Sequence, residues 1–314
     1  MKKILCAGIS TCDVYMKGFN SPPAPGTAIE IDDIFLEMGG GAANAMVDYA
    51  LLGGSATLCL RIGKDHAGRV IKDTLANYPA LDVVYSYDDG PTAISVAMIG
   101  DRDRSFACLL GTTLTFNRKD IPEEKIREAD IIYIAGGCLM HGFDCPDLTD
   151  FFRYCKSLGK ITMLDTAYDM RNVWLPAIAE ALPYIDYFVP SEAEARAMCG
   201  SANATAEEMT AFFAARGVKN MILKMGSEGV YVRTEDGNER WISGYPVEAV
   251  DTTGAGDSFC AGFSYGLANE WPVEQCVKFG NAVGSMCVSS IGACTGIKSA
   301  QEVLTFIHEY EKEG

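Results

Sequence analysis

The sequence predicts an α/β protein in which helices cover both faces of a mostly parallel sheet. Short apolar runs, which fit strands buried on both faces, alternate with longer stretches that fit helices. Repeated strand–helix units require crossover connections, and such connections leave neighbouring strands parallel. The chain has 314 residues, of which 48% are hydrophobic and 22% charged, so it can bury a sizeable core.

The individual elements follow one another in this alternation. Gly8, Ser10 and Asp13 cut the first apolar run short, so it fits a buried strand better than a signal peptide. The helix that follows ends at a pair of glycines, a common helix stop. The predicted strands, each flanked by turn signals, are residues 3–10, 56–63, 131–136, 160–165, 184–190 and 220–226. The predicted helices are residues 41–54, 65–78, 145–159, 257–270, 273–292 and 300–313.

Two regions lack this rhythm. Residues 12–37 show no helical periodicity, and residues 91–116 look like two strands around a turn at residues 100–104. Together they could form a small separate sheet that serves as a lid, or they could decorate an edge of the main sheet. Arg102 and Arg104 lie on the turn, where they could meet a carboxylate or phosphate of a substrate or simply be solvated.

Composition disfavours several classes of function. The formal net charge is −16, whereas a nucleic-acid binder normally carries a basic face. No apolar stretch is long enough to span a membrane. The 12 cysteines form no CxxC pair and lie in apolar segments, which disfavours a zinc site and fits a reducing, cytoplasmic location. A P-loop, a dinucleotide fingerprint and a GxSxG elbow are also absent from the sequence.

The segment DTTGAGDSFCAGF, residues 251–263, places an acid at the start of an apolar helix. Small residues at 254–256 let backbone N–H groups converge there, and these groups can bind an anion such as a phosphate in transfer. Asp257 beside them could accept a proton from an attacking hydroxyl, and the helix dipole should help to keep its carboxylate ionised. Phosphoryl transfer to an alcohol needs this pair of features. The alternative is that Asp257 is only a helix cap.

Four segments resemble, in order, the signatures of the ribokinase, or PfkB carbohydrate kinase, family. Residues 251–263 match the C-terminal signature almost letter for letter, and GGGAANAMVDYALLGG (39–54) looks like the N-terminal one. RIGKDHAGRVIKDTL (61–75) and LKMGSEGVYV (223–232) resemble two further family segments. The resemblance implies one kinase domain over residues 1–314, a three-layer α/β/α sandwich with a small β lid formed from approximately 12–37 and 91–116. It also implies transfer of the ATP γ-phosphate to a sugar or nucleoside hydroxyl with Mg²⁺.

The same resemblance implies roles for individual residues. Asp257 falls on the catalytic base, and Gly254, Ala255 and Gly256 fall on the anion hole. The implied substrate contacts are Asp13, Gly40, Gly41 and Asn44, with Arg104 on the lid turn as a further candidate. The implied nucleotide contacts are Lys224, Gly226, Gly229 and Asn281. The implied metal positions are Glu194, which would organise Mg²⁺ through water, and Asp251 and Thr253, which would bind a monovalent cation such as K⁺ with carbonyls near Val288, Ile291 and Ala293.

Other interpretations of these residues are open. Asn44 could be a helix cap and Asp13 a turn former. The family usually has Asn where this chain has Ser191, and the stretch SEAEA is also a good capping box, so Glu194 could simply start a helix.

The substrate is less defined than the chemistry. Many sugar kinases of the family carry D-x-N-x-R after a central strand, whereas this chain has Asp165, Asp169 and Arg171 without the Asn. The favoured hypothesis is an ATP-dependent kinase for a sugar or a sugar-like molecule. A nucleoside kinase of the same family and a non-catalytic sugar or nucleotide sensor are the alternatives. Family members often pair through their lids, so a homodimer is a further expectation.

Overall fold

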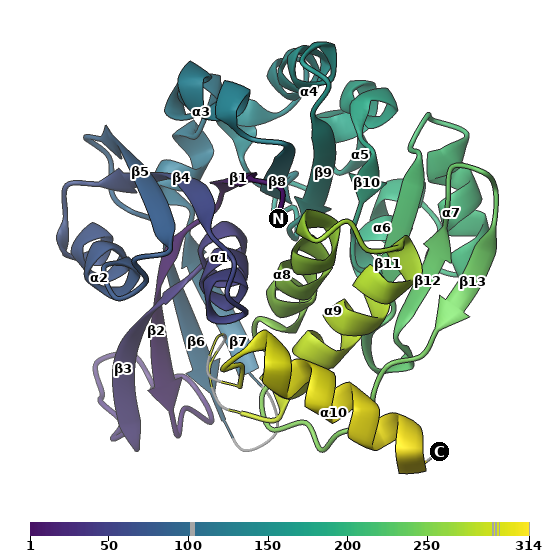
Figure 1. The fold of residues 1–314 in the computed structure, drawn as a ribbon. Helices are drawn as coiled ribbons and strands as arrows, with labels where there is room; N and C mark the ends of the chain where they lie inside the picture. The colour runs from purple at the N-terminus through teal and green to yellow at the C-terminus, as the bar shows by residue number, and fades with distance from the viewer. Residues whose placement is uncertain (101–103, 291, 293, 295, 314) are drawn as a thin grey trace.

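The structure, a computed structural model, describes residues 1–100, 104–290, 292, 294 and 296–313 (Figure 1). Its strands are β1 (Ile4–Gly8), β2 (Thr11–Lys17), β3 (Asp33–Gly39), β4 (Ala56–Gly63), β5 (Leu81–Asp88), β6 (Ile94–Ile99), β7 (Arg104–Leu109), β8 (Ile131–Gly137), β9 (Ile161–Thr166), β10 (Tyr187–Phe188), β11 (Asn220–Lys224), β12 (Val230–Arg233) and β13 (Glu239–Ile242). Its α-helices are α1 (Gly41–Leu51), α2 (His66–Leu75), α3 (Glu123–Glu128), α4 (Asp147–Ser157), α5 (Leu175–Ile178), α6 (Glu192–Cys199), α7 (Ala206–Ala214), α8 (Ala255–Ala268), α9 (Val273–Val288) and α10 (Ala300–Glu313).

The central sheet has nine strands in the order β13-β12-β11-β10-β9-β8-β1-β4-β5. In this order, every pairing from β11 across to β5 is parallel, and the only antiparallel pairings are those of β11 with β12 and of β12 with β13 at one edge. The mostly parallel sheet expected from the sequence is therefore confirmed. Alternate residues of β1 enter different cores, with Ile4 and Cys6 on one side and Leu5 and Ala7 on the other, which explains its unbroken apolar run.

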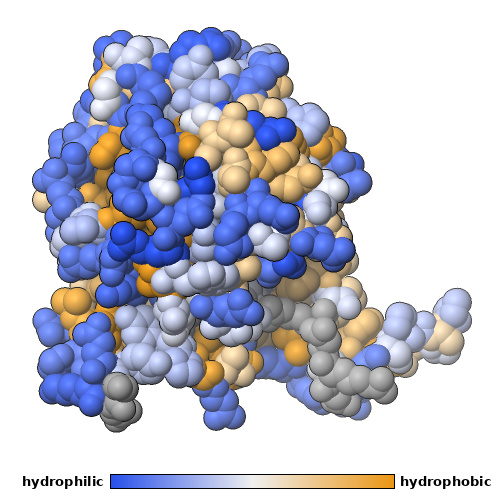
Figure 2. Space-filling view, turned by 90° about the vertical axis from the view of Figure 1, so that its right-hand side faces the viewer, coloured by the Kyte–Doolittle hydropathy of each residue, from blue (hydrophilic) through white to orange (hydrophobic). Residues whose placement is uncertain are grey.

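Helices cover both faces of this sheet, so the molecule has three layers (Figure 1). Helices α1, α2, α8 and α9 pack on one face, and α3 to α7 pack on the other. Helix α10 lies outside the first layer, where Val303 joins Phe279 and Val283 of α9. Of the described helices, none is both long and apolar enough to span a membrane. The face that carries α7 and β13 is mostly hydrophilic, with hydrophobic residues gathered in its upper half (Figure 2).

The lid is a separate four-stranded sheet in the order β3-β2-β6-β7. Its strands come from the two regions that lacked a helical rhythm in the sequence. Strand β2 pairs with β6 in parallel, and Cys12 lies opposite Ile94 although the two residues are far apart in the sequence. One detail differs from expectation: Gly111–Thr115 forms a 3-10 helix after β7 rather than more strand. Arg102 lies outside the described residues, and so does the side chain of Arg104.

The strand predicted at residues 184–190 is shorter in the structure than expected. The apolar run at residues 184–190 contributes only the two residues of β10 to the sheet. Residues 179–184 before it form a 3-10 helix that contains Pro183, and Pro190 follows it, so the backbone can pair over a short stretch only.

Candidate active site

The candidate site lies where the carboxyl ends of β1, β8, β9 and β11 meet the first turns of α1 and α8 (Figure 1). Ligands of open α/β sheets bind at this edge, next to the point where the strand order reverses. Here the reversal is at β1, which has β4 on one side and β8 on the other.

Three cavities meet this edge. The central cavity, of about 380 Å³, is lined by Gly41, Asp165, Glu194 and Asp257, among others. The helix-side cavity, of about 440 Å³, lies between the turn after β11, the loop at residues 244–249 and helices α8 and α9. The lid cavity, of about 160 Å³, lies between the lid strands and the main domain. The central cavity shares Lys224, Gly226 and Gly256 with the helix-side cavity and Ile9 with the lid cavity, so it adjoins both of them.

Asp257 lies in the first turn of α8, at the wall of the central cavity. Helix α8 begins at Gly254, whose φ of 77° is left-handed and suits glycine, and no side chain caps this helix. The interpretation of Asp257 as a cap is therefore wrong. Its Oδ2 instead accepts a hydrogen bond of 2.9 Å from Nδ2 of Asn44. Asn44 is not a cap either, because it lies inside α1, one turn after the N-cap residue Gly40.

The pKa of Asp257 is shifted in the direction opposite to that expected from the helix dipole alone. The surrounding protein desolvates the carboxylate and raises the pKa of Asp257 above its ordinary value, and nearby Glu194 acts in the same direction. The hydrogen bond from Asn44 and the charge of Lys224 lower that pKa and offset only part of the rise. A carboxylate with a raised pKa is a better proton acceptor, which suits a general base.

Two glycines leave room around the charged groups of Asp257 and Lys224. A Cβ atom on Gly41 would lie 3.3 Å from Oδ1 of Asp257, and one on Gly256 would lie 3.4 Å from Nζ of Lys224. The missing side chains keep both charged groups accessible from the cavity. In the first turn of α8, as in any α-helix, the backbone N–H groups have no carbonyl four residues earlier within the helix and can bind an anion.

The lid cavity contains Asp13, which lies inside strand β2 and is therefore not a turn former. Its Oδ1 accepts a hydrogen bond of 2.6 Å from the hydroxyl of Thr11. Burial raises the pKa of Asp13 to about 6, although the bond from Thr11 opposes the rise. Ser95 and Thr113 add hydroxyl groups to the same cavity.

The helix-side cavity collects the predicted nucleotide contacts. Lys224, Gly226, Gly229 and Asn281 all line it, together with Tyr245, Phe259 and several small residues. The side chain of Asn281 is already engaged, because its Nδ2 donates to the carbonyls of Ile242 and Ser243, at 3.1 Å each. Its described contacts therefore tie α9 to the loop after β13, and they shape the cavity wall.

The candidate metal positions fall into two groups. Glu194 lines the central cavity, and its Oε2 accepts bonds from the hydroxyl of Thr166 and the backbone N–H of Ser191, at 2.9 and 2.8 Å. The capping box with Ser191 is thus present, and it uses Oε2 of Glu194, so that Oε1 has no protein hydrogen bond among the described contacts. Asp251 accepts bonds from both the N–H and the hydroxyl of Thr253. Among the described residues, no group of three or more His, Cys, Asp or Glu side chains could hold a metal ion by itself.

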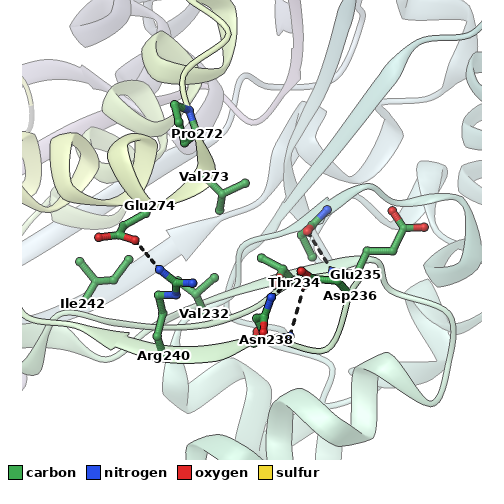
Figure 3. A pocket seen from close by; sticks show the side chains of 11 residues that line it. Val232, Thr234, Glu235, Asp236, Asn238, Arg240, Ile242, Pro272, Val273 and Glu274 are labelled. Carbon is green, nitrogen blue, oxygen red and sulfur yellow. Dashed lines mark hydrogen bonds and ion pairs between the residues drawn. The ribbon is translucent and has the colours of Figure 1, made fainter.

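A larger hollow, of about 660 Å³, lies away from these residues, between the β12–β13 hairpin and the start of α9 (Figure 3). Its polar groups are paired with one another: Arg240 with Glu274, and Asp236 with Thr234 and Asn238. They do not converge on a common point, so this hollow is a weaker candidate for a ligand site than the sheet edge.

The family model for "pfkB family carbohydrate kinase" matches residues 1–300. The chain belongs to this family. A ribokinase of Haemophilus influenzae is 27% identical over 297 residues, which cover 90% of this chain and 91% of the relative. A nucleoside kinase of Methanothermobacter thermautotrophicus is 24% identical over 307 residues, covering 96% and 94%. A solved structure of Arabidopsis thaliana ribokinase with ribose and ATP superimposes with a TM-score of 0.83 at 25% identity, covering 98% of both chains.

Membership establishes the class of chemistry of this pfkB-family protein: it is a phosphotransferase with an alcohol group as acceptor. The structure brings the candidate residues from both signatures together around the central cavity, since Gly41 and Asn44 of α1 contact or approach Asp257 of α8.

Sequence reasoning did not assign a site role to several residues of this pfkB-family kinase. Asp165, at the end of β9, forms an ion pair of 2.8 Å with Lys224 inside the central cavity. Thr11, Ser95 and Thr113 line the lid cavity. Two signals could have identified Asp165: its place in the incomplete D-x-N-x-R pattern and its position at the carboxyl end of a buried parallel strand.

Proposed function

We propose that this protein transfers the γ-phosphate of ATP to a hydroxyl group of a sugar or sugar-like small molecule, with Asp257 as the general base. The observation that carries the proposal is the position of Asp257. Its carboxylate is oriented by Asn44, borders the central cavity and adjoins the backbone N–H groups in the first turn of α8. A base beside an anion-binding helix start is the arrangement that phosphoryl transfer to an alcohol requires.

The reaction assigns one task to each part of the site. The acceptor hydroxyl lies in the central cavity and gives its proton to a carboxylate oxygen of Asp257. The acceptor oxygen forms a bond to the γ-phosphorus, the bond between that phosphorus and the bridging oxygen breaks, and the electron pair leaves with ADP. The N–H groups of Ala255 and Gly256 stabilise the negative charge of the group in transfer.

The remaining assignments follow the cavities. ATP occupies the helix-side cavity, with Gly226 and Gly229 near its phosphates and Asn281 near its adenine ring. The acceptor contacts Asp13, Gly40, Gly41 and Asn44. Asp13 lines the lid cavity, Gly41 lines the central cavity, and Asn44 donates a hydrogen bond to the general base Asp257. Carboxylate and amide groups suit sugar hydroxyls as hydrogen-bond partners.

Mg²⁺ fits the chemistry of the central cavity. It prefers oxygen ligands and commonly binds through one or two carboxylates, waters and substrate phosphates. The carboxylate of Glu194 faces the cavity with one oxygen outside the capping box, so it would hold a metal-bound water. When bound, Mg²⁺ would neutralise charge on the phosphates of ATP.

A second candidate function is phosphorylation of a nucleoside. The observation that favours it is the lining of the lid cavity, where Ile94, Leu109, Leu139 and Met170 make much of the wall apolar. Such a wall suits the planar base of a nucleoside better than a free sugar, whose surface is mostly polar.

Release of ADP, measured across a panel of free sugars, sugar acids, sugar phosphates and nucleosides, tests both candidates. Turnover with free sugars or sugar acids supports the first. Turnover with nucleosides alone supports the second. Binding of ATP without ADP release from any member of the panel would contradict both and favour a non-catalytic sensor.

We also propose that the protein forms a homodimer through its lid. The strand registers place Ile34 and Leu36 of β3 on the same face as Val14 and Met16 of β2 and Val96 and Met98 of β6, so these three strands present an apolar surface there. Ile34 and Leu36 are each 56% exposed, and contiguous exposed apolar surface commonly marks an interface.

Two further proposals concern the environment of the enzyme. Activation by K⁺ is supported by the turn at Asp251 and Thr253, which adjoins the end of α9 through bonds from the N–H groups of Val250 and Asp251 to the carbonyl of Val288. The carbonyls of Ile291 and Ala293 lie outside the described residues. A cytoplasmic location is supported by the 12 free cysteines, which suit a reducing compartment.

A further inference from the structure

The side chain of Lys224 lies where the nucleotide and acceptor sides of the site meet. Lys224 is the last residue of β11, its side chain is 13% exposed, and it lines both the helix-side and the central cavity. Its ammonium also adjoins the start of α8, since a Cβ on Gly256 would lie 3.4 Å from Nζ. A phosphoryl group that passes from one cavity to the other must cross this place.

A buried carboxylate holds the ammonium in position. Oδ1 of Asp165 lies 2.8 Å from Nζ of Lys224, and Asp165 is 4% exposed. Two other donors fix the carboxylate, because the N–H of Thr166 donates to Oδ1 and the thiol of Cys260 donates to Oδ2, at 3.0 and 3.5 Å. The side chain of Lys224 therefore has little freedom to leave the cavity wall.

The ammonium group of Lys224 is surrounded mainly by acidic groups in these cavities. Among the described residues that line the central and helix-side cavities, Lys224 is the only cation, whereas Asp165, Glu194 and Asp257 are acids. Burial is the largest single influence and lowers the pKa of Lys224, but Asp165, Cys260 and Glu194 together outweigh it and raise that pKa above its ordinary value, so the group stays charged. A negatively charged phosphoryl group in this region can therefore interact with one positively charged side chain among the described lining residues, that of Lys224.

We propose that Lys224 is a catalytic residue whose ammonium contacts the phosphoryl group during transfer, and that Asp165 is a positioning residue that holds the ammonium at the junction of the two cavities. This inference rests on the proposed function. The bonds made and broken are those of the proposed reaction: the acceptor oxygen binds the γ-phosphorus, ADP leaves with the electron pair, and Asp257 takes the proton. Lys224 keeps its proton throughout and stabilises charge on the non-bridging oxygens.

A structural role is the competing explanation. Lys224 could serve only to neutralise Asp165, because a buried charge without its partner is strongly destabilising. The double variant Lys224→Met/Asp165→Asn separates the two roles, since it removes both charges together and keeps the side-chain volumes similar. If Lys224 only neutralises Asp165, the double variant recovers the activity that Lys224→Met loses. If Lys224 acts on the phosphoryl group, it does not.

The experiment uses the full chain, ATP and the panel acceptor that releases ADP fastest. We expect Lys224→Met and the double variant to lower kcat by about 100-fold, with the KM for the acceptor unchanged, because removal of one charge-stabilising donor has effects of this size. Lys224→Arg should retain part of the lost kcat, since it keeps the charge. Asp165→Asn should lower kcat less than Lys224→Met, because the ammonium remains but is held less firmly. Calorimetry should show that Lys224→Met loses most of the preference for ATP over ADP.

Lys219→Met is the matched control, because Lys219 also pairs with a carboxylate, Asp186, at 3.4 Å but does not line either cavity. It should keep the wild-type kcat. Thermal unfolding checks that each variant is folded. A double variant with wild-type kcat, or a folded Lys224→Met with wild-type kcat, would overturn the inference. In either case a wild-type enzyme that releases ADP, and an Asp257→Asn variant that does not, would leave the proposed function standing.

Discussion

The hydrogen bond between Asn44 and Asp257 leads to a prediction about the pH dependence of turnover. Nδ2 of Asn44 donates to Oδ2 of Asp257 at 2.9 Å and stabilises the ionised carboxylate, which lowers the pKa of Asp257. The substitution Asn44→Ala removes this donor. The pKa of Asp257, already raised by desolvation, should then rise further, and the acid limb of the kcat profile should move to higher pH.

The size of the expected pKa shift follows from the fact that this hydrogen bond is made to a charged carboxylate. A hydrogen bond to a charged group contributes about 1.5–3 kcal/mol, and one pKa unit corresponds to about 1.4 kcal/mol. Loss of the bond should therefore move the limb upward by about 1–2 pH units. The sign is fixed because the base must be deprotonated to act: below its pKa, Asp257 holds a proton and cannot accept another.

The assay is kcat at saturating ATP and acceptor across pH, since Asn44 is also a proposed substrate contact and its loss would raise KM. Asn238→Ala is the matched control, because Asn238 lies on the exposed β12–β13 turn and does not line the central cavity. An acid limb in Asn44→Ala that stays in place, or that moves to lower pH, would refute the assignment of this limb to Asp257.

Three other predictions concern assembly, activation and stability. Leu36→Glu should convert a dimer to a monomer in sedimentation velocity, whereas Leu304→Glu, on the exposed side of α10, should not; an unchanged dimer in Leu36→Glu would exclude the lid face. Replacing K⁺ with tetramethylammonium should lower ADP release in the wild type but not in Asp251→Ala, and equal rates in both salts would remove the cation proposal. Phe152→Ala should lower the free energy of unfolding by about 3–5 kcal/mol in denaturant titrations, because Phe152 is 0% exposed; a loss below about 1 kcal/mol would show that the core around α4 closes over the gap.

Local patterns were sufficient to predict much of the fold. The apolar run at residues 56–63 coincides with β4, and the helix predicted at residues 300–313 coincides with α10. These elements have strong periodicity and clear stop signals. The strand predicted at residues 184–190 shrank to two residues, because hydrophobicity alone does not report where prolines interrupt sheet pairing.

The sequence likewise predicted some residues of the candidate site and missed others. Asp257 was a candidate because it lies in a short, specific motif, and Asn44 because its segment resembles the N-terminal signature of the family. The pair of Lys224 and Asp165 was not found, because the two residues are 59 positions apart and meet only through the order of strands β9, β10 and β11 in the sheet. The lid cavity could not be predicted from the sequence either, because its walls combine β2, β6 and β7 with Leu139 and Met170 of the main domain.

The most direct test of the account is the turnover of Asp257→Asn, which keeps the shape of the side chain but removes the base. With the best acceptor of the panel, kcat should fall by about 100- to 10,000-fold while calorimetry shows that ATP still binds. A folded Asp257→Asn enzyme that retains the wild-type kcat would contradict the assignment of Asp257 as the group that deprotonates the acceptor.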